Sequence, residues 1–110
     1  MAPAVKVGNI VYVSGQLARD AEDRIEGDMA TQTRRCLENL RTILHAAGAR
    51  MEHVVKITAF MTDMRLAPLA WAVREEFFAA NPPASTGVQV VALTRAEALI
   101  EIEAVAVITD

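Results

Sequence analysis

Two glutamates stand two residues apart in an otherwise apolar segment near the end of the chain. The stretch ALIEIEAVAVITD places Glu101 and Glu103 among alanine, valine, leucine and isoleucine. In a strand, residues at i and i+2 share a face and lie roughly 7 Å apart. A carboxylate in a partly apolar setting is able to take a proton from water and pass it to a leaving group.

Glu101 is therefore a candidate general base that holds a reactive water. The alternative is a structural carboxylate paired with Arg or Lys across a subunit interface. Nothing besides the spacing supports a catalytic pair, so we predict that Glu103 is structural and belongs to an interface hydrogen-bond network.

The segment that carries these glutamates is apolar on both faces. One face holds Ile100, Ile102, Ala104, Ala106 and Ile108, and the other holds Leu99, Glu101, Glu103, Val105 and Val107. The elements around it form the order β-β-α-β-α-β-β, with only two helices to cover the sheet. Since two helices cover one face, the second face is predicted to meet a partner.

The positions of these elements follow from turn residues and apolar periodicity. Strands are predicted in AVKVGNIVYVSGQ, around a turn at Gly8-Asn9, and in HVVKITAFMTD, TGVQVVAL and LIEIEAVAVI. One helix begins after Asp28 as N-cap and ends at Gly48, and another has Pro68 in its first turn and ends before Asn81. Residues 1–110 are thus predicted to form a single α+β domain, a mixed β-sheet with two helices on one face.

Two details of side-chain placement go with this assignment. In the third strand, we expect Val55, Ile57, Ala59 and Met61 to share one face, because they alternate. Cys36 lies on the apolar stripe of the first helix and is predicted to be a core residue.

Composition and charge argue against several classes of partner. The net charge is −3 and no basic run exceeds Arg34-Arg35, so we expect no nucleic-acid binding. No apolar run approaches the roughly 20 residues of a membrane span, and no signal-peptide pattern is present. A single cysteine fits a reducing compartment. These features predict a cytoplasmic protein without membrane contact.

The sequence contains no pattern typical of a metal or cofactor site. His45 and His53 flank the turn at Gly48 without a third ligand nearby in the sequence, and no Gly-rich phosphate loop is present. We therefore expect neither a metal nor a cofactor.

Short motifs along the whole chain, in their order and spacing, resemble the RidA (YjgF/YER057c/UK114) family. They are VYVSGQ at 11–16, Gly27-Asp28, Gln32-Thr33, Asn39-Leu40, Ala47-Gly48, VVKITAFMTD at 54–63, Phe77-Phe78, Pro83-Ala84 and EIEAVAV at 101–107. The resemblance implies a chorismate-mutase-like sandwich. It also implies a homotrimer with a central barrel and a cleft for a small-molecule substrate between each pair of subunits.

The resemblance further implies hydrolysis of reactive enamines and imines, such as 2-aminoacrylate, to a keto acid and ammonia. The first glutamate of EIE, here Glu101, would hold the attacking water. The sequence departs from the family at the substrate grip. Ser85 stands where an arginine is usual, Gly87 replaces a cysteine, Trp71 replaces an asparagine, and the N-terminal tyrosine has no counterpart.

These departures shape the predicted binding site. A serine cannot grip a carboxylate as arginine does, so either the substrate lacks that carboxylate or Arg74, one helical turn from Trp71, supplies the charge. An indole at position 71 favours a flat, conjugated ligand. The candidate substrate-binding residues are Ser14, Gly15, Gln16, Trp71, Arg74, Ser85, Thr86 and Gly87.

The sequence thus predicts a deaminase for an imine or enamine other than simple 2-aminoacrylate, such as an aminomuconate-type or other conjugated intermediate. The alternative is a small-molecule-binding or regulatory protein of the same fold without catalysis, which the missing arginine favours and Glu101 disfavours. A ribonuclease, an activity often attached to this family, is opposed by the acidic charge.

Overall fold

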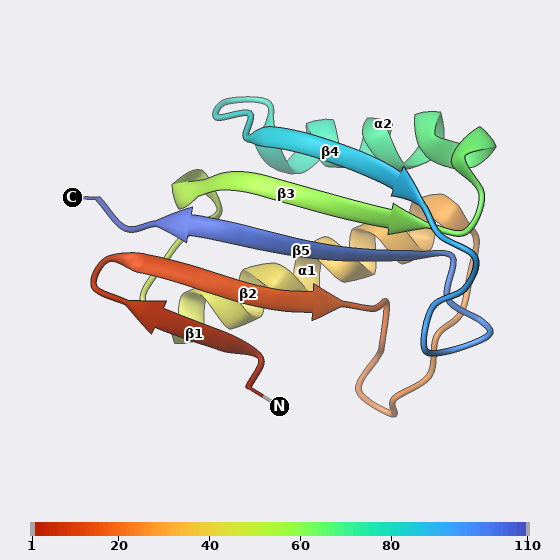
Figure 1. Cartoon of the computed structure of the whole chain (residues 1–110), viewed down its shortest axis with the longest axis horizontal. Coiled ribbons are helices and arrows are strands. Elements are labelled where there is room, and N and C mark those ends of the chain that lie inside the picture. Colours follow the sequence, from red (N-terminus) through yellow and green to blue (C-terminus); the bar gives the residue numbers. More distant parts are fainter. Residues whose placement is uncertain (1, 110) are drawn as a thin grey trace.

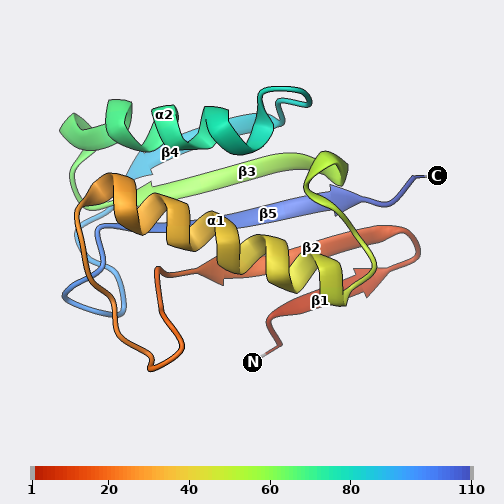
Figure 2. The same cartoon turned by 180° about the vertical axis from the view of Figure 1, so that it is seen from behind.

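Five strands form one mixed sheet, and two helices pack on one of its faces (Figures 1 and 2). The structure is a computed structural model and describes residues 2–109. The strands are β1 (Ala4–Val7), β2 (Ile10–Gln16), β3 (Val54–Met61), β4 (Ala84–Gln89) and β5 (Ile100–Val107), and the helices are α1 (Met29–Ala46) and α2 (Ala67–Phe78). The strand order is β1-β2-β5-β3-β4, with β3 and β4 parallel and the other neighbours antiparallel. The predicted α+β architecture is confirmed.

The ends of α1 are fixed by the residues that the sequence marks. Asp28 caps the helix, because its Oδ1 accepts a hydrogen bond from the backbone N–H of Thr31 at 2.9 Å. That hydrogen bond lowers the pKa of the Asp28 carboxyl. Gly48 follows the last turn with a φ of 85°, a left-handed conformation that glycine adopts without strain. The predicted start and end of this helix are confirmed.

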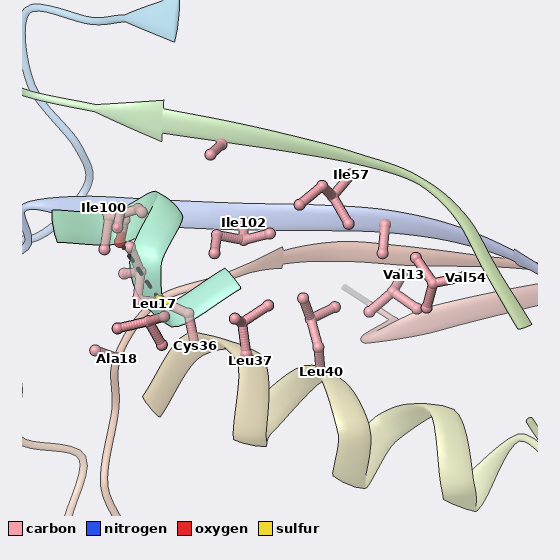
Figure 3. Close-up of a cluster of buried hydrophobic side chains, with 14 of the residues drawn as sticks. Val13, Leu17, Ala18, Cys36, Leu37, Leu40, Val54, Ile57, Ile100 and Ile102 are labelled. Atoms are coloured by element: carbon pink, nitrogen blue, oxygen red, sulfur yellow. Dashed lines mark hydrogen bonds between the residues drawn. The ribbon is translucent and has the colours of Figure 1, made fainter. Parts of the chain in front are cut away.

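The core lies between α1 and the helix-facing side of the sheet (Figure 3). The predicted alternation in β5 holds, since Ile100, Ile102, Ala104 and Ala106 are buried there. Opposite them, α1 contributes Cys36, Leu37, Leu40 and Leu44, all essentially inaccessible to solvent. Cys36 is therefore a core residue, as predicted. Burial raises the pKa of its thiol to about 12, and its Sγ donates to the carbonyl oxygen of Ile100 at 3.7 Å.

The predicted facing of β3 is wrong at its first residues. The register between β3 and β5 shifts between Val54 and Lys56, so the strand contains one more residue there than its partner. As a result Val54 is buried with Ile57, whereas Val55 is 47% exposed. The bulge depends on the pairing of two distant strands, which alternation along one strand does not encode.

The boundaries of β4 also differ from the prediction. β4 begins at Ala84 and ends at Gln89, earlier at both ends than the stretch TGVQVVAL. The segment after β4 instead crosses as a loop to the start of β5 (Figure 1).

No helix among residues 2–109 is both long enough and apolar enough to cross a membrane.

The face of the sheet away from the helices is uncovered in a single chain (Figure 1). It exposes Tyr12, 49% accessible, together with Val55, and Glu103 lies on it among the inner strands. Lys56 also lies on this face, where its Nζ donates to the hydroxyl of Thr86 at 2.7 Å. Large apolar side chains in this position are typical of an interface, so the predicted partner on this face stays a prediction with a defined surface.

Candidate active site

A hollow of about 480 Å³ opens where β2 ends and β5 begins, at one end of the sheet (Figure 1). It is lined by Ser14, Gly15, Gln16, Leu17, Arg19, Asn39, Thr94 and Glu101. The fold thus places four of the predicted site residues, from two antiparallel neighbours, around one space. Its size lies within the range of ligand-sized pockets.

A bulge in β2 shapes the place that the Glu101 carboxyl group occupies, called its seat below. Val13 pairs with Ala104 and Gln16 pairs with Ile102, so Ser14 and Gly15 together oppose a single residue of β5. The Glu101 carboxyl group rests against Gly15, so closely that a Cβ atom there would lie 2.7 Å from its Cδ. Glycine at this position leaves the room that the carboxylate occupies.

A buried amide fixes the start of β5, two residues before Glu101. Gln32 of α1 is 2% exposed, and its Oε1 accepts a hydrogen bond from the backbone N–H of Leu99 at 2.9 Å. Its Nε2 donates to the carbonyl oxygens of Glu97 and Gly27, each at 3.1 Å. The Gln32 side chain therefore connects α1 to the loop that precedes β5, at the edge of the hollow.

A second amide holds the other wall of the hollow. Asn39 Nδ2 donates to the carbonyl oxygens of Leu17 at 3.0 Å and of Arg19 at 3.1 Å. These bonds fix the segment after β2 against α1. With the side chain of Gln16, which donates to the Ser14 carbonyl at 3.0 Å, they give the hollow polar walls around one carboxylate. Such a lining is suited to a water and a small polar ligand.

A separate group on the helix-covered face of β4 contains four of the other predicted binding residues, Trp71, Arg74, Ser85 and Gly87. Arg74 Nη1 donates to the Ser85 hydroxyl at 3.1 Å, and the guanidinium stacks 4.2 Å from the centroid of the Trp71 ring. Gly87 lies beside the same indole, and a Cβ atom there would be 2.8 Å from Trp71 Cζ2. Arg74 and Ser85 also line a small hollow of about 130 Å³.

Within one chain the structure does not bring these two groups together. Ser85 pairs with Ile57 on the helix-covered side, and Thr86 points the other way, to Lys56. Glu101, by contrast, lies across β3 from β4, paired with Phe60. A site that uses both groups therefore requires residues from more than one subunit.

Four residues of the Glu101 hollow were not among the predicted site residues. They are Leu17, Arg19, Asn39 and Thr94. Asn39 belongs to a motif that carries the family resemblance, which was the one available signal for it. Arg19 and Thr94 stand in loops without a motif, and only the closure of those loops brings them to the hollow. Among residues 2–109, no cluster of three or more His, Cys, Asp or Glu side chains is arranged to hold a metal ion.

Comparison with known proteins assigns the chain to a family. The family model described as Endoribonuclease L-PSP matches residues 2–108, nearly the full chain. This chain belongs to the RidA (YjgF/YER057c/UK114) family. The assignment confirms the predicted family and, with the observed fold, the predicted chorismate-mutase-like sandwich.

Individual members of the RidA family are similar along almost the whole chain. The 3-aminoacrylate deaminase RutC of Acinetobacter baylyi is 42% identical over 106 residues, covering 94% of this chain and 83% of that protein. The human 2-iminobutanoate/2-iminopropanoate deaminase is 35% identical over 106 residues, covering 94% and 77%. A Thermotoga maritima protein of solved structure superposes with a TM-score of 0.95 and 38% identity, covering 100% and 87%.

Proposed function

We propose that this protein is an imine or enamine deaminase that releases ammonia, with Glu101 as the catalytic carboxylate. The observation that carries the proposal is the position of that carboxylate, seated against Gly15 in a polar hollow of ligand size. Similar proteins named as deaminases of 3-aminoacrylate and 2-iminobutanoate support the reaction class. Catalysis by one positioned carboxylate fits general acid–base chemistry.

In the proposed mechanism, water held by Glu101 attacks the imine carbon. The imine reacts in its protonated form, and an enamine reaches the same iminium ion by gaining a proton on carbon. Glu101 accepts a proton from the attacking water, which gives a neutral carbinolamine. The same carboxyl group returns that proton to nitrogen. The regenerated carboxylate then takes the hydroxyl proton as the C–N bond breaks, so that the carbonyl product forms and ammonia leaves. No redox step and no further reactant are needed.

The substrate we propose is larger than 2-aminoacrylate and is conjugated, such as an aminomuconate-type intermediate. Two observations favour this choice. The hollow at Glu101, about 480 Å³, is roomy for a three-carbon acid. Position 85 is a serine, and the indole of Trp71 nearby offers a flat apolar surface.

We further propose that the active protein is a homotrimer with substrate clefts between subunits. The uncovered face of the sheet, with Tyr12 about half exposed, supplies apolar surface for assembly. One subunit would contribute Glu101 with Ser14, Gly15 and Gln16, and its neighbour would contribute Trp71, Arg74, Ser85, Thr86 and Gly87. Sedimentation should therefore give about three times 11.9 kDa. A stable monomer that is fully active would contradict the shared cleft.

The test is ammonia release from imines generated in situ by an amino-acid oxidase or a dehydratase. The panel contains 2-aminoacrylate, aliphatic and aromatic α-imino acids, and a conjugated enamine. Glu101→Gln, which keeps the shape but not the base, should slow turnover about 100-fold or more. Glu103→Gln on the same strand is the matched control and should leave turnover nearly unchanged.

Two outcomes would contradict parts of this proposal. Turnover that is equally fast in Glu101→Gln would remove the assigned base. No turnover of any panel member, with tight binding of a conjugated acid by both the parent and Glu101→Gln, would show a binding protein without catalysis.

A further inference from the structure

Arg19 is a cationic residue that lines the Glu101 hollow, and the mechanism proposed above gives it no role. Of the described residues that line the hollow, it alone is positively charged. Glu101 by itself would repel an anionic ligand, because a second carboxylate nearby is unfavourable in a partly enclosed space. A guanidinium that turns toward a ligand in this hollow would offset that repulsion and would offer paired donors in the geometry of a carboxylate.

The backbone of Arg19 is fixed, although its side chain is not. Asn39 donates to its carbonyl oxygen at 3.1 Å, and the residue forms a bridge to Ile25 across the following loop. These contacts set where the side chain begins. A cation on a fixed backbone is ready to bind a ligand without the cost of ordering a loop.

The guanidinium itself is weakly held. Its Nε lies 3.4 Å from Asp23 Oδ1, in a pair whose side chains are 50% and 72% exposed. Exposed pairs of this kind contribute little to stability. Within residues 2–109, the terminal Nη atoms of Arg19 form no hydrogen bond with the protein, so they remain available to a ligand.

Asp23 is itself held by Arg95, which follows Thr94, a lining residue of the hollow. Arg95 Nη2 donates to the Asp23 carbonyl oxygen at 3.2 Å, and Arg95 Nη1 lies 3.4 Å from Asp23 Oδ2. Asp23 has a φ of 63°, a left-handed conformation that needs support from its surroundings. Arg95 thus joins the loop after β2 to the loop that carries Thr94, and it holds the acidic partner of Arg19 in place.

We propose that Arg19 binds a carboxylate of the substrate in the Glu101 hollow. The inference rests on the proposed function, and it defines the substrate as an imine or enamine that carries a carboxylate. With the carboxylate at Arg19, the imine carbon would lie toward Glu101 and its water. Arg19 is then a determinant of specificity in the chain that also provides the base, distinct from Arg74 on α2.

The test compares a charged and an uncharged substrate in matched variants. Ammonia release is measured with 2-iminobutanoate and with the imine of its methyl ester. Arg19→Gln should raise KM for the acid about 10- to 100-fold, because a charge-assisted pair is lost, and should leave KM for the ester unchanged. Arg19→Lys should recover part of the loss. Arg35→Gln, an exposed arginine of α1 that does not line this hollow, is the control.

The outcomes separate this inference from the proposed function. An active parent whose acid and ester KM values change equally, or not at all, in Arg19→Gln would overturn the role of Arg19 alone. If the parent acts only on a conjugated member of the panel, that acid and its methyl ester replace 2-iminobutanoate and its ester in the comparison. If the parent releases no ammonia from any imine or enamine of the panel, the proposed function fails, and calorimetric titration with 2-oxobutanoate then tests the carboxylate site alone. Weaker binding by Arg19→Gln than by the parent would support the carboxylate site, whereas equal binding, or none by the parent, would overturn it.

Discussion

A Cβ atom on Gly15 would lie 2.7 Å from Cδ and 2.8 Å from Oε2 of Glu101. The two residues belong to neighbouring strands, and the bulge at the end of β2 brings them together. Contacts this short do not occur between real Cβ atoms and their neighbours, so any side chain at position 15 must displace the carboxylate. The position of the proposed base therefore depends on a residue with no side chain.

Gly15→Ala should abolish most ammonia release while the fold persists. The new methyl group turns the flexible Glu101 side chain away from its seat, and a shift of about 1 Å in a catalytic group is able to cost about 100-fold in rate. Gly8→Ala is the matched control. Gly8 has open space around it but a φ of 59°, so alanine there should cost about 1 kcal/mol in stability and nothing in turnover. Equal activity of Gly15→Ala and the parent would contradict the assigned seat.

Gln32→Leu should destabilise the protein strongly. The Leu99 N–H and the carbonyl oxygens of Glu97 and Gly27 would lose their partner in partly buried surroundings, at up to about 1–3 kcal/mol for each unsatisfied group. We expect a loss of about 3 kcal/mol in the free energy of urea unfolding, measured at one protein concentration. The same substitution at the exposed Gln89, whose Oε1 accepts from the Met64 N–H, should cost less than about 1 kcal/mol. Similar losses in both variants would argue against a special role for Gln32.

The Cys36 thiol makes stability depend on alkaline pH. Its pKa rises from 9.0 to about 12 in the fold, chiefly through burial and also through the charge of Glu101. Between these values the unfolded chain loses a proton that the folded chain keeps, so this contribution is complete below pH 9 and is lost as pH rises toward 12. The slope is at most about 1.4 kcal/mol per pH unit.

Comparison with Cys36→Ala isolates this effect from other groups that titrate at high pH. The parent should lose more stability than the variant between pH 9 and pH 11, measured from urea midpoints. Native protein should also resist alkylation by iodoacetamide at pH 8, because the thiol is buried and protonated. Parallel pH curves for the two proteins would show that the thiol does not titrate on unfolding.

Leu40→Ala should test the core between α1 and the sheet. Leu40 is 1% exposed in the cluster of Figure 3, and a cavity at such a site costs about 2–5 kcal/mol. Leu69→Ala on α2 removes the same atoms from a side chain that is 49% exposed and should change stability by about 0.5 kcal/mol or less. Both are measured by urea unfolding at fixed protein concentration, since assembly would add a concentration dependence. A small loss at Leu40 would indicate that the helix packs loosely.

Local patterns were enough to predict most of the fold. The cap at Asp28, the glycine at position 48 and the alternation in β5 are properties of neighbouring residues, and all are observed. Val55 escaped prediction because its facing depends on a bulge against β5. A bulge is a property of two paired strands, and the sequence of one strand does not reveal it.

For the candidate site, too, the sequence predicted the local features and not the contacts between distant residues. The sequence by itself determined that a carboxylate stands in a strand with two apolar faces, that Gly15 and Gln16 end another strand, and that Ser85 replaces a cation. Only the tertiary structure decided which of these meet. It joined Glu101 to Gly15 and added Arg19, and it placed Ser85 with Arg74 on the other side of the sheet. The reason is physical, because side-chain alternation is set locally, whereas the hollow forms where two strands far apart in the sequence, β2 and β5, pair with each other. Hydrogen bonds such as that of Asn39 to the Arg19 carbonyl then hold the adjoining loop in place.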